Sequence, residues 1–179
     1  MVSENASIVD NQQERLSVSH EDLNFYISGF VDGEGCFSVT VCRSNFRKLR
    51  WNINPFFQVY QHKDNTYVLN VIKEVFECGY ISKKGGNPLC NVYCVDKISD
   101  LIGIVIPFFD EYKLFGNKYL DFQLFKQIVT GIKNQEHLNP DGFIRLARLA
   151  FLMNSKGKHR KNKLEDIFRE IKESSEAKR

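Results

Sequence analysis

The spacing of apolar residues predicts that the first ordered element is an amphipathic helix. From residue 23 onward, apolar side chains recur at i, i+3, i+4, i+7 and i+8, which places them on one face of a helix. Ser19 followed three residues later by Asp22 resembles a capping box at the helix start. The predicted apolar face consists of Leu23, Tyr26, Ile27, Phe30 and Val31, and Gly33 and Gly35 end the helix.

The apolar period changes from 3.6 to 2 after Gly35, which predicts two antiparallel strands at 36–43 and 51–61 joined by a basic loop at 43–50. One face of this pair is apolar and belongs to the core, and the other carries hydrogen-bonding groups. The core face comprises Phe37, Val39, Val41, Trp51, Ile53, Phe57 and Val59, and the other face Ser38, Thr40, Cys42, Asn52, Asn54, Gln58 and Tyr60.

The rest of the chain predicts two further strands among helices. A helix is predicted at 64–77, with the buried stripe Tyr67, Val68, Val71, Ile72 and Val75. Strands at 79–84 and 90–95 flank a Gly-Gly-Asn-Pro turn. Three helices follow: one at 97–106 that ends at Pro107, one at 117–131, and one that begins at the Asn139-Pro140 cap and extends to 153. In the strand at 90–95, either Cys90, Val92 and Cys94 or Asn91 and Tyr93 face away from the core.

The element order predicts an α+β fold, in which a four-stranded antiparallel sheet has helices on one face. We expect one domain over residues 20–153, a flexible N-terminal arm at 1–19, and a charged helix or tail at 154–179. The open face of the sheet would present Ser38, Thr40, Asn52, Asn54, Gln58, Ser82 and Lys84.

The distribution of charge is more informative than its sum. The 179 residues include 25 Lys+Arg and 22 Asp+Glu, a net charge of +3 that by itself identifies no partner. Residues 36–63, however, contain Arg43, Arg47, Lys48, Arg50 and Lys63 and no acidic residue. Amide, hydroxyl and cationic side chains suit base edges and phosphates. On composition alone, an ordinary solvated face remains the alternative.

Several classes of protein are excluded or disfavoured. No apolar run reaches the roughly 18–20 residues of a membrane span, so we expect a soluble protein. The cysteines number 5, form no Cys-x-x-Cys pair and favour free thiols in a reducing compartment over zinc. Residues 1–19 resemble neither a secretory signal nor a transit peptide, so we expect the protein to act where it is made.

The segment from Ile27 to Gly35 combines small residues with an acid at a helix end. Gly29 and Gly33 lie four residues apart on one helix face, where they would let a second helix approach closely. Glu34 then emerges at the C-terminus, where the helix dipole disfavours a carboxylate unless a cation accompanies it. An ordinary helix ending in a glycine cap with a solvated Glu34 is the alternative.

This segment, Ile27-Ser28-Gly29-Phe30-Val31-Asp32-Gly33-Glu34-Gly35, resembles the motif that names the LAGLIDADG homing endonucleases. The resemblance continues in residues 57–61, 79–81 and 117–122, covers about residues 20–131, and includes the element order αββαββα. It implies a saddle-shaped sheet, with extra C-terminal helices here, and site-specific cleavage of both strands of a long DNA target.

The resemblance also implies a set of site residues. Glu34, with the carbonyl of Gly33, would bind Mg²⁺, with Mn²⁺ or Ca²⁺ as substitutes in vitro; Gln61 would order water near the scissile phosphate; Lys118 or Lys113 would be the catalytic cation. DNA contacts are expected from Ser38, Thr40, Cys42, Arg43, Arg47, Lys48, Arg50, Asn52, Asn54, Gln58, Tyr60, Ser82 and Lys84.

The motif occurs once in the chain, and cutting two strands requires two sites, so we expect a homodimer and a pseudo-palindromic target. Its interface would include Ser28, Gly29, Asp32 and Gly33. Two alternatives stay open: an intron maturase that binds RNA, and a nucleic-acid-binding protein of this fold without cleavage. The resemblance and the absence of an import signal favour an intron reading frame in a chloroplast or mitochondrion.

Overall fold

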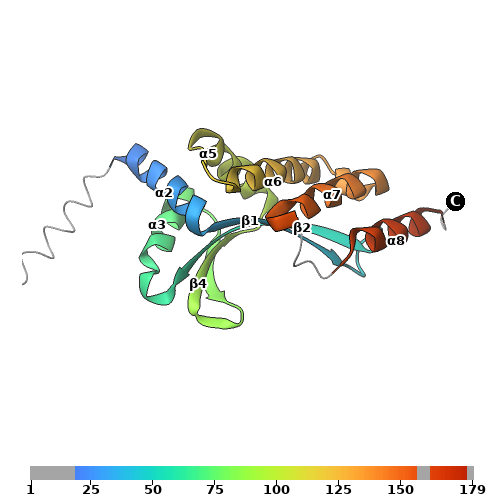
Figure 1. The fold of residues 1–179 in the computed structure, drawn as a ribbon, viewed down its shortest axis with the longest axis horizontal. Coiled ribbons are helices and arrows are strands. Elements are labelled where there is room, and N and C mark those ends of the chain that lie inside the picture. The colour runs from blue at the N-terminus through green and yellow to red at the C-terminus, as the bar shows by residue number, and fades with distance from the viewer. Residues whose placement is uncertain (1–18, 157–161, 177–179) are drawn as a thin grey trace, which may run out of the picture.

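The predicted α+β fold is confirmed by a computed structural model, which describes residues 19–156 and 162–176 (Figure 1). One sheet of four antiparallel strands, in the order β1-β2-β4-β3, carries helices on one face. The expected N-terminal arm at 1–19 lies, except for Ser19, outside the described residues. Among the described residues, no helix is long and apolar enough to span a membrane.

Helix α2 (His20–Glu34) begins and ends close to the predicted positions. The Ser19 hydroxyl oxygen accepts a hydrogen bond from the Asp22 amide at 3.1 Å, so the predicted cap is present. The predicted apolar face is only partly correct, because Ile27 and Val31 are buried whereas Tyr26 is 55% exposed. One long side of α2 therefore lacks a covering element within the described chain.

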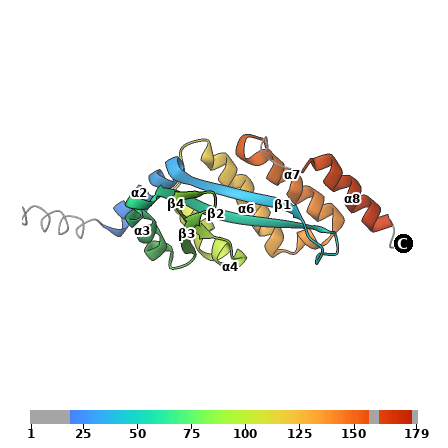
Figure 2. The ribbon, with the colours of Figure 1, turned by 90° about the horizontal axis from the view of Figure 1, so that it is seen from below.

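Strands β1 (Gly35–Arg43) and β2 (Trp51–His62) form a long hairpin that crosses the molecule (Figure 2). Their register pairs Phe37 with Phe57 and Thr40 with Asn54, which confirms the predicted division into an apolar and a polar face. Strand β4 pairs with β2 only from Phe57 onward, so residues 51–56 of β2 have an open edge. Pro55, which has no N–H to donate, lies in this part of the strand, where it is tolerated.

Strands β3 (Tyr80–Lys84) and β4 (Asn87–Val95) complete the sheet. Gln58 lies opposite Cys94, and Tyr60 lies opposite Val92. Since directly opposed residues share a face, Cys90, Val92 and Cys94 lie on the outer face. Tyr93 points inward, is fully buried, and donates its hydroxyl to the Cys78 carbonyl at 3.0 Å. The register thus decides the orientation that the sequence left open.

Helix α3 (Tyr67–Phe76) follows a single 3-10 turn at Lys63–Asn65. Val68, Leu69, Ile72 and Phe76 are buried, whereas Tyr67 is 64% exposed. The buried stripe is therefore rotated relative to the prediction, because Leu69 and Phe76 pack inward instead of Tyr67.

The prediction that Pro107 ends a helix is wrong. Helix α4 (Ile98–Asp100) continues through a π-helical segment (Leu101–Val105) into α5 (Ile106–Glu111). The Ile106 amide donates to the Leu101 carbonyl five residues earlier, so the helix widens just before the proline. Pro107 then occupies the first turn of α5, where its fixed φ is compatible with a helix.

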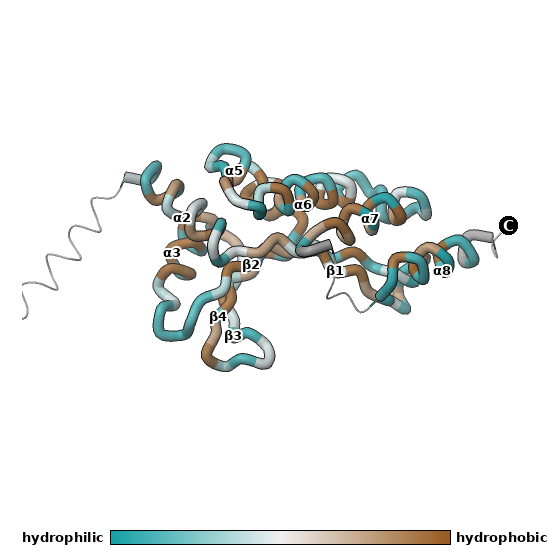
Figure 3. The backbone as a smooth tube through the Cα atoms, in the orientation of Figure 1, coloured by the Kyte–Doolittle hydropathy of each residue, from teal (hydrophilic) through white to brown (hydrophobic). Residues whose placement is uncertain are grey.

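Three helices close the structure: α6 (Lys118–Lys133), α7 (Pro140–Lys156) and α8 (Leu164–Glu176). The side-chain amide oxygen of Asn139 accepts from the Gly142 amide at 2.7 Å, so the predicted cap of α7 is present. In Figure 3, hydrophobic and hydrophilic turns alternate along α6 and α7, as expected for helices with one buried face. Ile167 and Ile171 of α8 are fully buried, so this helix is part of the core.

The core is built around the aromatic ring of Phe37 on β1. Its centroid lies 5.1 Å from that of Phe57 on β2, and 5.4, 5.2 and 5.3 Å from those of Phe109, Phe122 and Phe125. Aromatic rings at such separations add to the free energy gained by burial alone. This cluster fixes α5 and α6 on the sheet.

We expect Gly79→Ala to destabilise the protein more than Gly86→Ala. Both glycines have positive φ values, 72° and 79°. A Cβ at Gly79 would lie 2.5 Å from the Cys94 carbonyl oxygen, whereas one at Gly86 would meet no described atom within 4 Å. Backbone strain should lower the free energy of unfolding by about 1–2 kcal/mol at either position, and the clash should add to it at Gly79. Urea unfolding measures both; equal losses would contradict the packing at Gly79.

Candidate active site and nucleic-acid interface

The carboxylate of Glu34 lies at the C-terminal end of α2 and is exposed. Immediately after it, the chain enters β1 without an intervening loop, because the Gly35 amide donates to the Val31 carbonyl. A Cβ at Gly35 would lie 2.5 Å from Cγ1 of Val31, so only glycine fits this junction. The helix end and the strand start together fix where Glu34 emerges.

Lys118, the first residue of α6, binds the end of α2. Its Nζ donates to the Val31 carbonyl at 2.9 Å and to the Gly33 carbonyl at 3.1 Å. Burial lowers the pKa of Lys118 below its ordinary value, and the nearby Cys36, Asp32 and Glu34 oppose this shift. The cation therefore neutralises the helix C-terminus next to Glu34. Lys113 is exposed and contributes only its carbonyl to the contacts of α2.

Ser28 and Asp32 use their side chains within the chain. The Ser28 hydroxyl lies 2.9 Å from the Tyr112 carbonyl and 3.2 Å from that of Lys113 and donates to this pair, and Ser28 is only 4% exposed. One Asp32 oxygen accepts from the amides of Phe115 and Gly116 at 3.1 and 2.8 Å. Both residues were predicted for an interface between two copies. Their side chains hold the loop between α5 and α6, whereas the other two predicted interface residues, Gly29 and Gly33, face open space among the described residues.

The two small residues of α2 lie on its uncovered side. A Cβ at Gly29 or at Gly33 would meet nothing within 4 Å in the described chain. The neighbouring rings of Tyr26 and Phe30 stack with centroids 6.1 Å apart, and Tyr26 is largely exposed. A second helix could therefore approach α2 closely along this side without displacing any described residue.

The oxygen donors at the end of α2 suit a hard divalent cation only in part. The described residues contain no group of three or more His, Cys, Asp or Glu side chains placed to hold a metal ion. Mg²⁺ commonly takes one or two carboxylates and completes its shell with water and phosphate oxygens. Glu34 and the second lone pair of the Gly33 carbonyl match such a partial set, so the residues fit a metal shared with DNA and another carboxylate.

Gln61 lies close to the level of this helix end. Gly35 pairs with Val59, so Gln61, two residues further along β2, extends beyond the first residue of β1. Its side-chain oxygen accepts from the His62 amide at 2.8 Å, which orients the side chain. The side-chain nitrogen of Gln61 takes no part in that contact and can donate elsewhere.

The outer face of the sheet carries two chains of polar contacts. Asn54 donates to Cys42 and accepts from Asn52. Tyr60 donates to Gln58 at 2.5 Å, and the ammonium of Lys84 lies 4.5 Å from the centre of the Tyr60 ring. Burial raises the pKa of Tyr60, and the thiols of Cys36, Cys94 and Cys90 add to the shift. Ser38, Thr40 and Ser82 share this face by register, together with the apolar residues Phe56 and Val92, so the face is largely but not wholly polar.

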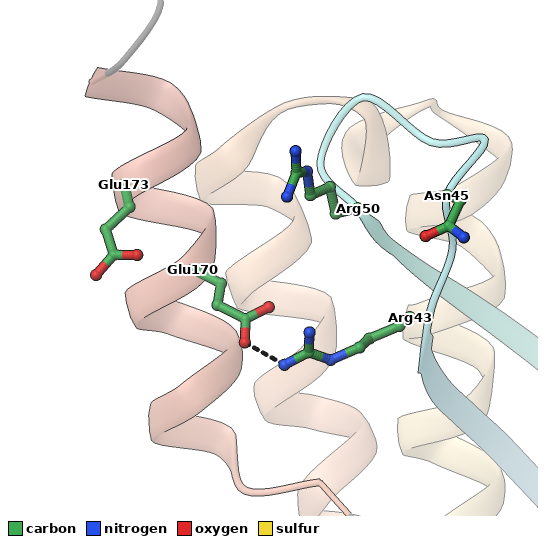
Figure 4. A pocket seen from close by; sticks show the side chains of 5 residues that line it. All are labelled: Arg43, Asn45, Arg50, Glu170 and Glu173. Carbon is green, nitrogen blue, oxygen red and sulfur yellow. Dashed lines mark hydrogen bonds and ion pairs between the residues drawn. The ribbon is translucent and has the colours of Figure 1, made fainter.

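Arg43 was also predicted to contact DNA, and strand parity places it on the other side of the sheet, where its side chain is still 67% exposed. Arg43 continues the inward positions of Val39 and Val41 and forms an ion pair with Glu170 of α8 (Figure 4). Arg50 also faces α8 in a pocket of about 460 Å³. Arg47 instead lines a groove of about 540 Å³ beside Asn52 and Asn54, and Lys48 is exposed in the same loop.

His137 is a residue of this groove that sequence reasoning missed. It belongs to a 3-10 turn (Glu136–Leu138) after α6 and reaches the groove beside Arg47 at the open edge of β2. Burial lowers the pKa of His137, and the charge of Arg47 lowers it further. No local pattern marks this position, because the turn and the groove are far apart in sequence.

Comparison with protein families gives one match. Residues 27–129 match the family described as LAGLIDADG endonuclease, and this range includes the C-terminal half of α2, the whole sheet and most of α6. The matched segment therefore contains Glu34, Gln61 and Lys118.

Individual relatives agree with this match. The chain is 35% identical over 124 residues to the probable intron-encoded endonuclease 2 of Neurospora crassa, covering 69% of this chain but only 26% of that protein. It is 29% identical over 153 residues to the homing endonuclease I-ApeII of Aeropyrum pernix, covering 83% and 90%. The solved structure of the archaeal intron-encoded homing endonuclease I-Vdi141I complexed with DNA has a TM-score of 0.81, with 31% identity and coverage of 88% and 99%.

Replacing Lys118 with methionine should destabilise the fold, whereas Lys113→Met should not. Lys118→Met leaves two carbonyls at the end of α2 without their donor, which should cost about 1–2 kcal/mol of unfolding free energy. Lys113→Met removes an equal charge from an exposed side chain and should change stability by less than about 0.5 kcal/mol. Urea unfolding of both variants tests the assignment, and similar values would contradict it.

Proposed function

This chain belongs to the LAGLIDADG endonuclease family, and we propose that it is a homing endonuclease that cuts both strands of a long DNA site as a homodimer. The chain spans about a quarter of the length of the Neurospora relative, so its activity, target and assembly are all part of this proposal. By contrast, the match to I-Vdi141I, whose structure was solved complexed with DNA, covers 99% of that protein.

One observation carries the proposal: Glu34 is exposed at the end of a helix whose open side is lined by Gly29 and Gly33. If two copies cross along these glycines, two Glu34 carboxylates converge near the crossing point. Each copy then contributes a carboxylate, and the paired sites serve the two DNA strands. A monomer offers only one such acid at this position.

The metal is proposed to be held by Glu34 and the Gly33 carbonyl, completed by DNA oxygens and the acid of the second copy. When bound, Mg²⁺ supplies Lewis-acid stabilisation of the phosphate and lowers the pKa of coordinated water. Lys118 neutralises the helix end beside Glu34, which lowers the electrostatic cost of placing a carboxylate there.

The remaining roles fall to neutral and cationic side chains. The amide of Gln61 is proposed to orient water near the scissile phosphate, since its carbonyl oxygen is fixed by the His62 amide. Lys118 is preferred over Lys113 as the cation near the phosphate because it lies beside Glu34. Lys113 remains exposed near the same loop and is the second candidate.

DNA is proposed to lie against the outer face of the sheet. This face is polar and bordered by Arg47, Lys48 and Lys84, and no acidic residue occurs between residues 36 and 63. Amide side chains such as Asn52, Asn54 and Gln58 can pair with base edges in a major groove. The two-fold axis of the dimer makes the target pseudo-palindromic.

The genetic setting is proposed to be an intron reading frame in an organelle. Relatives named as intron-encoded occur in Neurospora crassa and in Schizosaccharomyces pombe, whereas I-ApeII comes from Aeropyrum pernix. The first DNA to test as a target is accordingly the insertion site without the intron, in which the two flanking exon sequences are joined.

Glu34→Gln should bind this DNA and fail to cut it. The substitution keeps the size of the side chain and removes the charge that a metal requires, so cleavage in Mg²⁺ should fall at least about 100-fold. Binding measured in Ca²⁺ should change little, because the outer face of the sheet is unaltered. Cleavage is followed on end-labelled duplexes and binding by fluorescence anisotropy.

The matched control is Glu21→Gln, which removes an exposed carboxylate from the other end of α2. It should cut at the wild-type rate. Wild-type cleavage by Glu34→Gln would remove Glu34 from the metal site, and RNA binding without DNA cleavage by the wild-type protein would favour the splicing role.

Gly29→Leu should weaken the homodimer. A Cβ at Gly29 would meet nothing within 4 Å among the described residues, but a leucine side chain there would separate the two crossing helices. Since the clash is repeated by symmetry, the dissociation constant should rise at least about 30-fold. Sedimentation velocity measures it, with Gly103→Leu as a control at another exposed helical glycine that has open space around it. A wild-type protein that stays monomeric on DNA would contradict the assembly.

A further inference from the structure

The loop between β1 and β2, residues 44–50, has a defined shape. The Ser44 amide donates to the Arg50 carbonyl at 2.8 Å, and the Arg50 amide donates to the Arg47 carbonyl at 2.9 Å. Leu49 is only 8% exposed and joins the hydrophobic core. The loop is therefore anchored at its base by hydrogen bonds and near its end by Leu49, so the residues at its tip have a defined position.

Phe46 at the tip of this loop is 99% exposed. Burial of a phenylalanine side chain contributes roughly 1.5–3 kcal/mol, and Phe46 gains none of this within its own fold. A binding partner that covers the ring would recover this free energy. Its neighbours Arg47 and Lys48 are basic, and the surrounding segment has no acid, which matches a polyanion. Aromatic and aliphatic side chains contact thymine methyl groups and base faces in DNA.

The outer half of this hairpin lacks the support of a wide sheet. Strand β4 pairs with β2 only as far as Phe57, so residues 38–43 and 51–56 form a two-stranded ribbon. An isolated two-stranded ribbon is marginally stable in water. Its position must therefore depend on the helices that pack against it.

Helix α8 supplies a specific contact at this place. Glu170 forms an ion pair with Arg43 and accepts a hydrogen bond from the indole N–H of Trp51 at 3.1 Å. The guanidinium of Arg43 also lies 5.3 Å from the centre of the Trp51 ring. Since Arg43 ends β1 and Trp51 begins β2, Glu170 holds both strands at the base of the loop. Figure 4 shows the contact with Arg43.

The helix itself is fixed by burial of Ile167 and Ile171. Asn162, just before α8, donates to the Val41 carbonyl of β1 at 3.2 Å. Glu170 therefore acts from a rigid support, and the contact can transmit the position of α8 to the loop.

We propose that α8 braces the β1–β2 hairpin through Glu170 and thereby positions Phe46 to contact bases at the outer end of each DNA half-site. Phe46 is then a specificity-determining residue, and Glu170 is a positioning residue that does not touch DNA. This inference rests on the proposed endonuclease function and extends it to a part of the chain outside the matched family segment.

The test compares matched pairs of variants on a set of target duplexes, each carrying one base-pair substitution. Phe46→Ala is paired with Leu152→Ala, which removes another exposed apolar side chain, from α7. Glu170→Gln is paired with Glu173→Gln, one turn along α8; Glu173 lines the same pocket but is not joined to either arginine there. Binding of every duplex is measured, and thermal unfolding is recorded for each variant.

Phe46→Ala should reduce discrimination at the outermost positions about fivefold and leave the inner positions unchanged. Glu170→Gln should reduce discrimination at the same positions by a smaller factor, about two- to threefold, and both controls should keep the wild-type profile. A role in folding alone would weaken binding to all duplexes equally. Arg43→Gln should reproduce the Glu170→Gln profile, and the double variant should lose no more than either single one.

A wild-type profile for Phe46→Ala, or identical profiles for Glu170→Gln and Glu173→Gln, would overturn the inference. Failure of the proposed function is distinguishable, because the wild-type protein would then show no sequence preference among the duplexes, before any variant is compared. That result would overturn both proposals.

Discussion

The attachment of the α2 C-terminus to the segment 112–118 is the constraint on which the candidate active site depends. Contacts run in both directions: Ser28 donates to carbonyls of the loop, Asp32 accepts from its amides, and Lys118 donates to carbonyls of α2. Hydrogen bonds to charged groups contribute about 1.5–3 kcal/mol each, so the junction is strong. Because these contacts occupy the inner side of α2, its glycine-lined side stays open and Glu34 is exposed.

The two ends of the sheet are supported in different ways. Near α2, four strands and the aromatic cluster around Phe37 form a rigid base. Further out, only β1 and β2 continue, and helices replace the missing strands as support. The largely polar outer face extends over both parts, which gives a long surface from a small domain. Its outer end depends on tertiary contacts with α8 much more than its centre does.

The sequence predicted strongly periodic features well. Val39 and Val41 alternate cleanly with Thr40, so the strand and its two faces were evident, and Ser19 marked the start of α2. The same alternation places Arg43 at the next inward position after Val41. Its ion pair with Glu170 could have been suspected from this position, whereas its charge alone suggested only a DNA contact.

Other features had no local signal. The π-helical turn before Pro107 is an adjustment of backbone hydrogen bonding that no side-chain pattern specifies. Choosing between Lys113 and Lys118 required knowing where α6 starts relative to α2. The partner of Arg43 is 127 residues away, and charged residues of α8 resemble a solvated surface until Ile167 and Ile171 are seen to be buried. Contacts between residues so far apart in sequence can be identified only once the fold is known.

The long-range contacts of β1 also have a consequence for biosynthesis. Asn154 donates to the Phe37 carbonyl across 117 residues, and Asn162 to the Val41 carbonyl across 121. Because a chain emerges from the ribosome N-terminus first, the apolar face of β1 is made long before the helices that cover it. The nascent hairpin must wait for α7 and α8, and during that interval its exposed face is a natural substrate for chaperones. Folding of this domain is therefore expected to finish only after most of it has been translated.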